Sequence, residues 1–324
     1  MENFEQMKYL LIILLLGGCS HHTSKTSRPG ESNEEPKWLY APYEGCSEAS
    51  ELCATGEGKT STQADSEARA NLASIFEVRV KSDVSITTSS TQSFPWQAEV
   101  KEEVLKSVQE SVDQILESVQ IKNHHRKQGI SHSLASLDRQ TAGGLIRGRM
   151  GKLDDELEVL WNTHQRTNLR RIVKLFMERE RLNERYSIVS GMGIPSKVSW
   201  AEIIKWRASK PKSEPVLLKI GQAPDWLKEK LSELLSESGF HIVKGDADKI
   251  VTVQVDSIKE FLNVEGFEKF TFTVSISSVV DGGQKRTIST SDTVTGRTQA
   301  DALLKVKNSF NDYIEQHLSD LRLD

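Results

Sequence analysis

The sequence has 324 residues, of which 37% are hydrophobic and 27% charged, a balance typical of chains that bury a core. This length allows two ordinary domains with connecting segments. The 42 lysines and arginines are outnumbered by 46 aspartates and glutamates, so the net charge is -4. Because nucleic-acid binding needs a basic surface, the composition argues against a nucleic-acid partner.

The amino end has the pattern of an export signal. Lys8 precedes an unbroken apolar run from Leu10 to Leu16, and Gly17-Gly18-Cys19 follows it. A positive residue, a short apolar run and small residues before a cleavage point are the parts of a secretory signal peptide. The run is much shorter than the about 20 residues that a membrane-spanning helix needs. We therefore predict a signal peptide over residues 1–18.

Leu16-Gly17-Gly18-Cys19 resembles the lipobox of bacterial lipoproteins, in which a leucine and two small residues precede a cysteine. The resemblance implies that Cys19 becomes the acylated first residue of the mature protein. Its palmitate-type chains would hold it in a lipid bilayer at roughly 0.8 kcal/mol per buried methylene. Ser20 stands where similar inner-membrane proteins carry aspartate, which implies an anchor in the cell outer membrane, facing the periplasm. A secreted protein with a free cysteine is the alternative.

Residues 19–37 are predicted to be a flexible tether between the lipid and the first folded residue. Their composition of His, Ser, Thr, Lys, Pro, Gly and Glu shows no periodicity. The adjacent His21 and His22 are interpreted as solvated side chains rather than metal ligands.

Residues 38–140 are predicted to form a first α+β domain. A short strand over 52–58 ends in a glycine turn, and Thr62 then caps a helix whose dipole Asp65 complements. Apolar residues that alternate with polar ones over 78–86 predict a second strand. The remaining elements expected in this domain are an amphipathic helix over 100–115 and a hairpin around Gln128-Gly129 that ends at Leu137.

Residues 141–190 are predicted to form a helical hairpin arm. Apolar residues from Ile146 to Leu160 alternate steps of four and three, the spacing of a coiled-coil seam. The polar segment 162–165 interrupts this pattern, and a second helical run ends near Tyr186. We expect an antiparallel hairpin that projects from the first domain and offers a protein-binding or oligomerising surface. One continuous helix is the alternative.

Residues 191–215 are predicted to be a linker and residues 216–324 a second α+β domain. The fold class is therefore α+β, with two small domains linked by the hairpin arm. The elements expected in the second domain are strands over 216–220, 241–243, 250–258, 270–280 and 288–294, a helix from Trp226 to Leu235 and a closing helix over 302–321.

One tetrapeptide occurs in each domain. Thr62-Gln63-Ala64-Asp65 recurs as Thr298-Gln299-Ala300-Asp301, each time after a glycine and a basic residue and each time at the start of a predicted helix. We interpret the repeat as one strand-to-helix device used twice, with an old duplication or chance as its origin.

No set of residues in the sequence indicates catalysis. Gly56-Glu57-Gly58-Lys59-Thr60 ends like a phosphate-binding loop, but Cys53 stands where that loop requires glycine, so we interpret it as a capped strand-to-helix turn. No Gly-x-Ser-x-Gly or His-Glu-x-x-His motif occurs. His124 and His125 lie in a predicted strand, and their rings should point to opposite faces, a poor geometry for one shared metal ion. We predict no catalytic residue, no metal site and no cofactor, and we expect a protein that is not an enzyme. An envelope hydrolase is the third alternative.

Cys46 and Cys53 are the two cysteines that remain after Cys19 is acylated. In an oxidising compartment they are candidates for a structural disulfide, which would close a small loop and contribute about 2–3 kcal/mol in the chain-entropy model. Free thiols are the alternative. The spacing does not fit a Cys-x-x-Cys redox motif.

Several short motifs resemble the LPP-twenty (LPP20-type) family of bacterial lipoproteins. They are Trp38, the strand Cys53-Ala54-Thr55-Gly56-Glu57-Gly58, the helix segment Ala68-Arg69-x-x-Leu72-Ala73 and Leu137-Asp138-Arg139. Thr55 departs from the family pattern, in which a valine-like residue is common. Related members are flagellar outer-membrane lipoproteins of the FlgP kind and the amino-terminal domain of FlgT. The resemblance implies a structural or assembly role in the envelope and transfers no catalytic residue.

These features predict an outer-membrane lipoprotein, without enzymatic activity, that has a structural or assembly role in a cell-envelope complex such as a flagellar or secretory machine. The expected partners are the lipid bilayer through Cys19, other envelope proteins and a second copy of the chain. The alternative is a periplasmic binding module for peptidoglycan or another envelope polymer, suggested by a supply of exposed aromatic residues at Trp200, Trp206 and Trp226, although Trp226 fits better as a side chain that packs its own helix.

Overall fold

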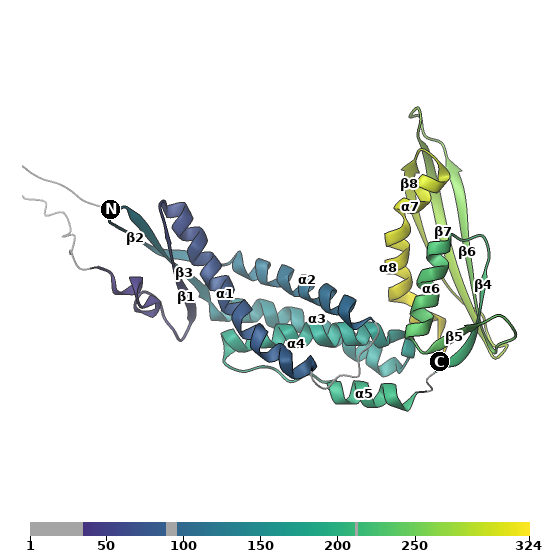
Figure 1. The fold of residues 1–324 in the computed structure, drawn as a ribbon, viewed down its shortest axis with the longest axis horizontal. Helices are drawn as coiled ribbons and strands as arrows, with labels where there is room; N and C mark the ends of the chain where they lie inside the picture. The colour runs from purple at the N-terminus through teal and green to yellow at the C-terminus, as the bar shows by residue number, and fades with distance from the viewer. Residues whose placement is uncertain (1–34, 89–95, 211–212) are drawn as a thin grey trace, which may run out of the picture. The chain divides into compact units, whose positions relative to one another are not determined.

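The computed structural model describes residues 35–88, 96–210 and 213–324, within which it has eight α-helices and eight strands in two sheets (Figure 1). The predicted α+β class is therefore confirmed. The predicted signal peptide and nearly all of the predicted tether lie outside the described residues. Within the described part of the chain, no helix has the length and hydrophobicity needed to cross a bilayer.

The first sheet is antiparallel and has the strand order β1-β3-β2. Its hairpin turns at Gln128 and Gly129, as predicted, with φ values of 48° and 86°. Two consecutive residues with positive φ are typical of the type I′ turn, which matches the twist of paired strands. The elements are η1 (Lys37–Leu39), η2 (Pro42–Glu44), β1 (Glu51–Gly58), β2 (Gln120–Lys127) and β3 (Ile130–Asp138).

Helix α1 (Ser61–Thr88) follows β1 and is much longer than predicted. The strand expected over 78–86 is wrong, because the helix continues through these residues. The sequence has no glycine or proline between Ser61 and Thr88, so nothing local stops the helix once its first turns have formed. The order of elements in this domain is therefore strand, two helices and hairpin, and not the alternating order that the sequence predicts.

The cap of α1 begins two residues before the predicted one. The Oγ1 of Thr60, rather than that of Thr62, accepts a hydrogen bond from the backbone N–H of Gln63 at 3.2 Å. The Gln63 side chain accepts one in return from the N–H of Lys59 at 3.0 Å. This reciprocal pair is similar to a capping box, except that the N–H bonded by Gln63 belongs to the residue before the cap. Asp65 is not part of it and contacts the sheet instead.

The same device starts helix α7 in the second domain. Thr298 accepts a hydrogen bond from the N–H of Asp301 at 3.2 Å, and Asp301 accepts one from the N–H of Arg297 at 3.0 Å. The repeated tetrapeptide aligns Thr62 with Thr298. The structure instead makes Thr60 equivalent to Thr298, a shift of two residues. The shared pattern is glycine, a basic residue, threonine, two residues, an acceptor and alanine, at 58–64 and 296–302.

The glycines of this device let the strand and the helix approach closely. A Cβ on Gly58 would lie 2.6 Å from the backbone nitrogen of Ala64, and one on Gly296 would lie 2.7 Å from that of Ala302. Gly56 is still tighter, since its Cβ would lie 2.1 Å from the backbone nitrogen of Ala68. Only glycine fits such positions, which explains why glycines end both strands.

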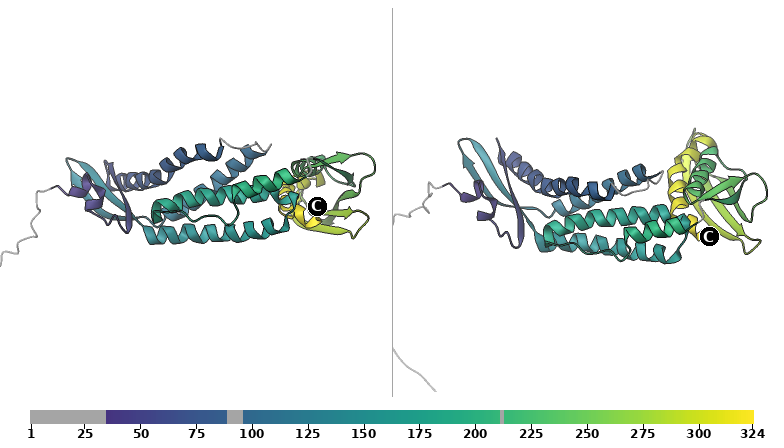
Figure 2. Two further views of the ribbon diagram at one scale, coloured as in Figure 1. Left: turned by 90° about the horizontal axis from the view of Figure 1, so that it is seen from below. Right: turned by 60° about the horizontal axis from the view of Figure 1, so that its bottom comes forward.

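Helices α3 and α4 form the predicted hairpin (Figure 2). Asp138 caps α3 by accepting a hydrogen bond from the N–H of Thr141 at 2.6 Å. Arg139 donates to the carbonyl oxygens of Ile188 and Val189, at 2.9 and 3.3 Å. The start of α3 is thereby fastened to the end of α4. The elements are α2 (Gln97–Leu116), α3 (Arg139–Thr163), η3 (Arg166–Asn168) and α4 (Leu169–Ser190).

The hairpin does not project as a free arm. Helix α4 packs against α2 as well as α3, and hydrophobic side chains of the first sheet and of the helices up to α5 form one continuous core. Helix α5 (Trp200–Ser209) lies within the segment predicted to be a linker. It begins with a capping box between Ser199 and Glu202 and buries Ile203 against the same core.

The second sheet is mixed and has the strand order β5-β4-β6-β7-β8. Strand β4 is parallel to β5 and to β6, while β6, β7 and β8 are antiparallel. The predicted closing helix is broken at Val306 into two helices. The elements are β4 (Glu214–Ile220), α6 (Asp225–Glu237), β5 (Phe240–Val243), β6 (Lys249–Glu260), β7 (Glu268–Val280), β8 (Arg286–Gly296), α7 (Gln299–Lys305), α8 (Lys307–His317) and η4 (Leu318–Leu321).

One face of this sheet is covered and the other is open. Helices α6, α7 and α8 lie on one face (Figure 1), over buried side chains of β7 such as Phe272, Val274 and Ile276. Because side chains alternate along a strand, the residues between them point to the other face. There the hydroxyls of β7 and β8 bond in pairs: Thr271 with Thr293, Thr273 with Ser291 and Ser275 with Ser289.

The close contact between β1 and α1 predicts a contrast between two glycines. Gly56→Ala places a Cβ against the backbone of α1, and we expect it to lower the free energy of unfolding by about 1–3 kcal/mol, the usual cost of overpacking. Gly144→Ala, in α3, meets no atom within 4 Å. It should raise the free energy of unfolding by roughly 0.5–1 kcal/mol, because alanine favours a helix over glycine. Urea unfolding measures both, and equal effects would contradict the packing argument.

Candidate functional site

Cys19 lies outside the described residues, so its acylation stays a prediction. The described chain begins at Glu35, and its first buried side chain is Trp38. Trp38 packs with Cys53 and Leu134 on the face of the first sheet that is turned away from α1. Cys46 and Cys53 are joined by a disulfide bond, which fastens the segment before β1 to that strand.

The two histidines of β2 point to opposite faces, as their strand positions predict. The Nε2 of His124 lies 2.7 Å from an Oδ1 of Asp65 on α1, and the Ser133 hydroxyl donates to the same oxygen at 2.5 Å. Burial acts to raise the pKa of Asp65, but the hydrogen bonds from Ser133 and His124 outweigh it and lower that pKa. Since serine and histidine both contact the carboxylate and not each other, they form no nucleophile–base pair.

The segment that ends like a phosphate-binding loop is a strand end packed under a helix. Gly56 and Gly58 belong to β1 and face α1 at distances that leave no room for a ligand. The interpretation as a capped turn is confirmed.

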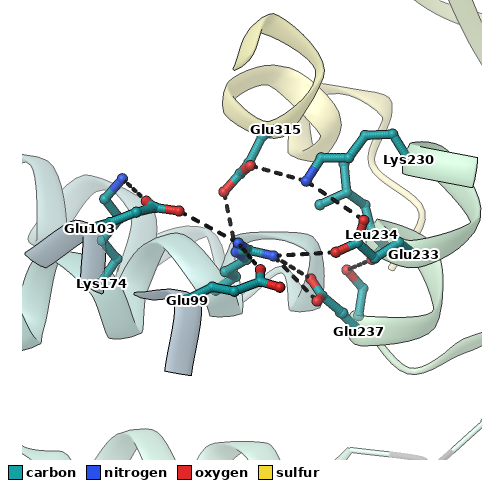
Figure 3. Close-up of polar contacts among 10 residues, drawn as sticks. Glu99, Glu103, Lys174, Lys230, Glu233, Leu234, Glu237 and Glu315 are labelled. Carbon is teal, nitrogen blue, oxygen red and sulfur yellow. Dashed lines mark hydrogen bonds and ion pairs between the residues drawn. The ribbon is translucent and has the colours of Figure 1, made fainter. Parts of the chain in front are cut away.

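Acidic side chains from helices of the first core and of the second sheet converge at one place (Figure 3), where they surround a buried arginine. The side chain of Arg170, near the start of α4, is only 9% exposed. It is surrounded by carboxylates from α2, α6 and α8. The distances from its guanidinium nitrogens are 3.0 Å to Glu99, 3.6 Å to Glu103, 3.8 Å to Glu233, 3.2 Å to Glu237 and 3.3 Å to Glu315.

Two lysines complete this cluster, which we call the Arg170 cluster. Lys174 pairs with Glu103, and Lys230 lies 3.4 Å from Glu315. Burial raises the pKa of Glu237, against the opposing attraction of Arg170. Burial acts to lower the pKa of Arg170, but the charges of Glu315 and Glu237 outweigh it and raise that pKa. The arginine therefore stays charged and acts as a fixed cation between three helices.

A second arginine forms a similar contact nearby. The Nε of Arg166 donates to the Asp324 carboxylate at 2.6 Å, and an Nη2 lies 2.9 Å from Glu214 on β4. Its guanidinium also lies 4.5 Å from the centre of the Phe240 ring, a cation–π distance. Burial acts to raise the pKa of Glu214, but Arg166 and Lys249 together outweigh it and lower that pKa. Arg166 and Arg170 thus bind the second domain through charge, and the sequence predictions contain neither.

A hollow of about 500 Å³ lies beside the Arg170 cluster. Its lining is mostly charged, and includes Glu103, Glu156, Arg171, Lys174 and Glu315. Such a lining differs from the mostly apolar walls of a small-molecule pocket. We regard the hollow as a solvent-exposed edge of the contact between the first core and the second domain.

The loop between β6 and β7 exposes an unusual group of apolar side chains. Phe261 is 90% exposed, and Ile258 just before it is 66% exposed. Val264 and Phe267 in the same loop are also exposed. Exposed apolar side chains that gather in one place mark interaction surfaces, whereas single ones are common on any protein. We call residues 261–267 the apolar loop.

The aromatic residues that suggested polymer binding are not freely exposed. Trp200 stacks on Phe176 at 5.6 Å between ring centres, and Trp206 meets Trp161 edge-on at 5.6 Å. Both pack against the first core, and Trp226 packs against the second. The observation that motivated the polymer-binding alternative is therefore wrong.

No family model matches the sequence, and no curated protein matches it. Among solved structures, the secreted protein HP1454 from Helicobacter pylori is 15% identical, with a TM-score of 0.34, over 85% of this chain and 99% of that one. A minor lipoprotein from Acinetobacter baumannii is 16% identical, with a TM-score of 0.26, over 34% of this chain and 92% of that one. The rare lipoprotein B from Shewanella oneidensis is 12% identical, with a TM-score of 0.24, over 33% and 91%. These similarities are too weak to assign a family.

The Arg170 cluster predicts a large loss of stability when its cation is removed. Arg170→Met removes the central cation and leaves the carboxylates with only Lys174 and Lys230 at the edge of the cluster. We therefore expect the free energy of unfolding to fall by about 3–5 kcal/mol, the usual cost of breaking a buried ion pair. The control is Lys197→Met, which breaks an exposed pair with Glu158 and should have little effect. Urea unfolding measures both variants, and similar values for the two would show that the cluster carries no special weight.

Proposed function

We propose that this chain is a non-enzymatic lipoprotein of the bacterial outer membrane, facing the periplasm, that binds a partner protein within a larger envelope complex, such as a flagellar or secretory machine. The lipobox supports the anchor, and the apolar loop supports the partner. Phe261, nine-tenths exposed beside three other apolar side chains, is the observation that carries the proposal. A water-exposed group of this kind gains most when another protein covers it.

The charges around the apolar loop favour a protein over a lipid surface. Asp256, Glu260, Glu265 and Glu268 outnumber the basic residues in and around the loop, which are Lys259, Lys269 and Arg297, the last of them 5.9 Å from the Phe267 ring. Loops that insert into anionic membranes carry an excess of basic residues beside their apolar ones. The hairpin α3–α4 offers less for this role than the sequence predicted, because α4 is buried between other helices.

The anchor is tested by changing the lipobox cysteine. Cys19→Ala should abolish labelling with radioactive palmitate and release the protein from the membrane fraction, because acylation supplies the attachment. Ser20→Asp should keep the label and shift the protein from the outer to the inner membrane in a density gradient. Palmitate labelling of Cys19→Ala at the wild-type level would contradict the anchor.

The partner is tested by a photo-crosslinking amino acid placed at Phe261. An aromatic crosslinker replaces the side chain with little change in shape, and illumination of intact cells should yield an adduct with one or a few envelope proteins. The control position is Asp246, exposed in the loop at the opposite end of β6. Mass spectrometry identifies the adducts. Equal crosslinking at the two positions, or none at Phe261, would contradict the assignment of the loop.

A further inference from the structure

Two histidines and a glutamate form a row across the first sheet. His132 on β3 is paired directly with Glu57 on β1 and directly with His125 on β2. The three side chains therefore come from three neighbouring strands at one level of the sheet. They lie on the face turned away from α1, where Trp38 also packs.

The neighbours of each residue hold the row on this face. Gly56 and Gly58 face α1, so Glu57 between them points the other way. On β3 and β2, Ser133 and His124 reach Asp65 of α1, so the adjacent His132 and His125 point away from it. The contacts with α1 thus orient the row.

His132 lies close to Glu57, while His125 stands farther from it, so the three ligand atoms do not converge without side-chain rotation. The Nδ1 of His132 lies 3.4 Å from the Oε1 of Glu57, and the ring centres of His132 and His125 are 6.5 Å apart. Directly paired residues of neighbouring strands have Cβ atoms about 4.5–5.5 Å apart. Glu57 and His125 lie on either side of His132, so both must turn toward it for the three side chains to meet at one ion. The side chain of His132 is 13% exposed and that of Glu57 is 69% exposed. His132 at the centre of the row is therefore mostly buried, whereas Glu57 at its end is open to solvent.

We propose that Glu57, His125 and His132 bind a divalent transition-metal ion, with Zn²⁺ as the best fit. Two imidazoles and one carboxylate form a ligand set that Zn²⁺ takes at about 2.0–2.2 Å, with water in the fourth position. Imidazole nitrogens favour such ions over Mg²⁺ and Ca²⁺, which prefer oxygen. The ion would connect β1, β3 and β2. Lys127, the next residue of β2 on this face, donates to the hydroxyl of Tyr40 at 3.0 Å, which holds its ammonium group by another partner.

Calorimetric titration with Zn²⁺ tests the site. The full-length protein is purified from envelopes in detergent, without reductant, in a parent carrying His21→Ser and His22→Ser, so that the tether contributes no imidazole. We expect the parent to bind one Zn²⁺. Loss of a residue that merely orients a metal ligand weakens metal binding roughly 10–100-fold. His125→Ala and His132→Ala remove ligands themselves, so each should weaken Zn²⁺ binding by at least that factor. Glu57→Gln should weaken it in the same direction.

Two histidine variants serve as matched controls. His124→Ala changes the neighbouring residue of the same strand, which points to the other face, and His241→Ala changes an exposed histidine of the second sheet. Both should bind Zn²⁺ as the parent does. Because ligands stabilise the state that binds them, Zn²⁺ but not Mg²⁺ should also raise the melting temperature of the parent and leave that of His125→Ala unchanged. No Zn²⁺ binding by the parent, or unchanged binding by His125→Ala and His132→Ala, would overturn the proposal.

Discussion

Helix α4 is both highly charged and largely buried, and the rest of the structure depends on how these two properties are reconciled. Five of its charged side chains are buried. A buried charge without a partner costs several kcal/mol, so the neighbouring helices must supply opposite charges at fixed places. Glu178 meets Arg149 of α3, Arg179 meets Asp154 of the same helix, and Arg170 meets carboxylates of three other helices. These pairs select one register for the helices around α4, where apolar contacts alone would allow sliding.

The sequence predicts the helices and strands whose apolar pattern repeats over many residues. It does not predict the features that depend on contacts between residues far apart in the chain. The helix over Ile146 to Leu160 and strand β7 are predicted correctly, because the apolar residues of each follow one buried face over several turns or residues. The segment 78–86 was misread because alternating valines fit a strand and, without a breaker, a helix equally well. Helix α5 was missed although Ser199 and Glu202 carry a capping-box pattern, since its apolar stripe is short.

The junction between the two cores has no local signature at all. Arg166 and Asp324 are 158 residues apart in the sequence, and the carboxylates around Arg170 come from three separate helices. Sequence periodicity says nothing about which charges meet across such a distance. The row of Glu57, His125 and His132 was hidden for a related reason. Each residue lies on a different strand, and only the sheet register places them side by side. The proposed partner-binding loop belongs to the second sheet, which contacts the first core through Arg166 and Arg170 among other residues.

The disulfide has a chemical consequence that depends on where the chain folds. The sulfur atoms of Cys46 and Cys53 and the carboxylate of Glu51 all lie within 4.8 Å of one another. While the bond is intact, the sulfurs are not available as ligands. A chain kept in a reducing compartment would instead carry two thiols beside a carboxylate, a set that attracts soft cations such as zinc or copper(I). If the chain is exported as proposed, oxidation of this pair removes two thiolates that would compete for metal ions.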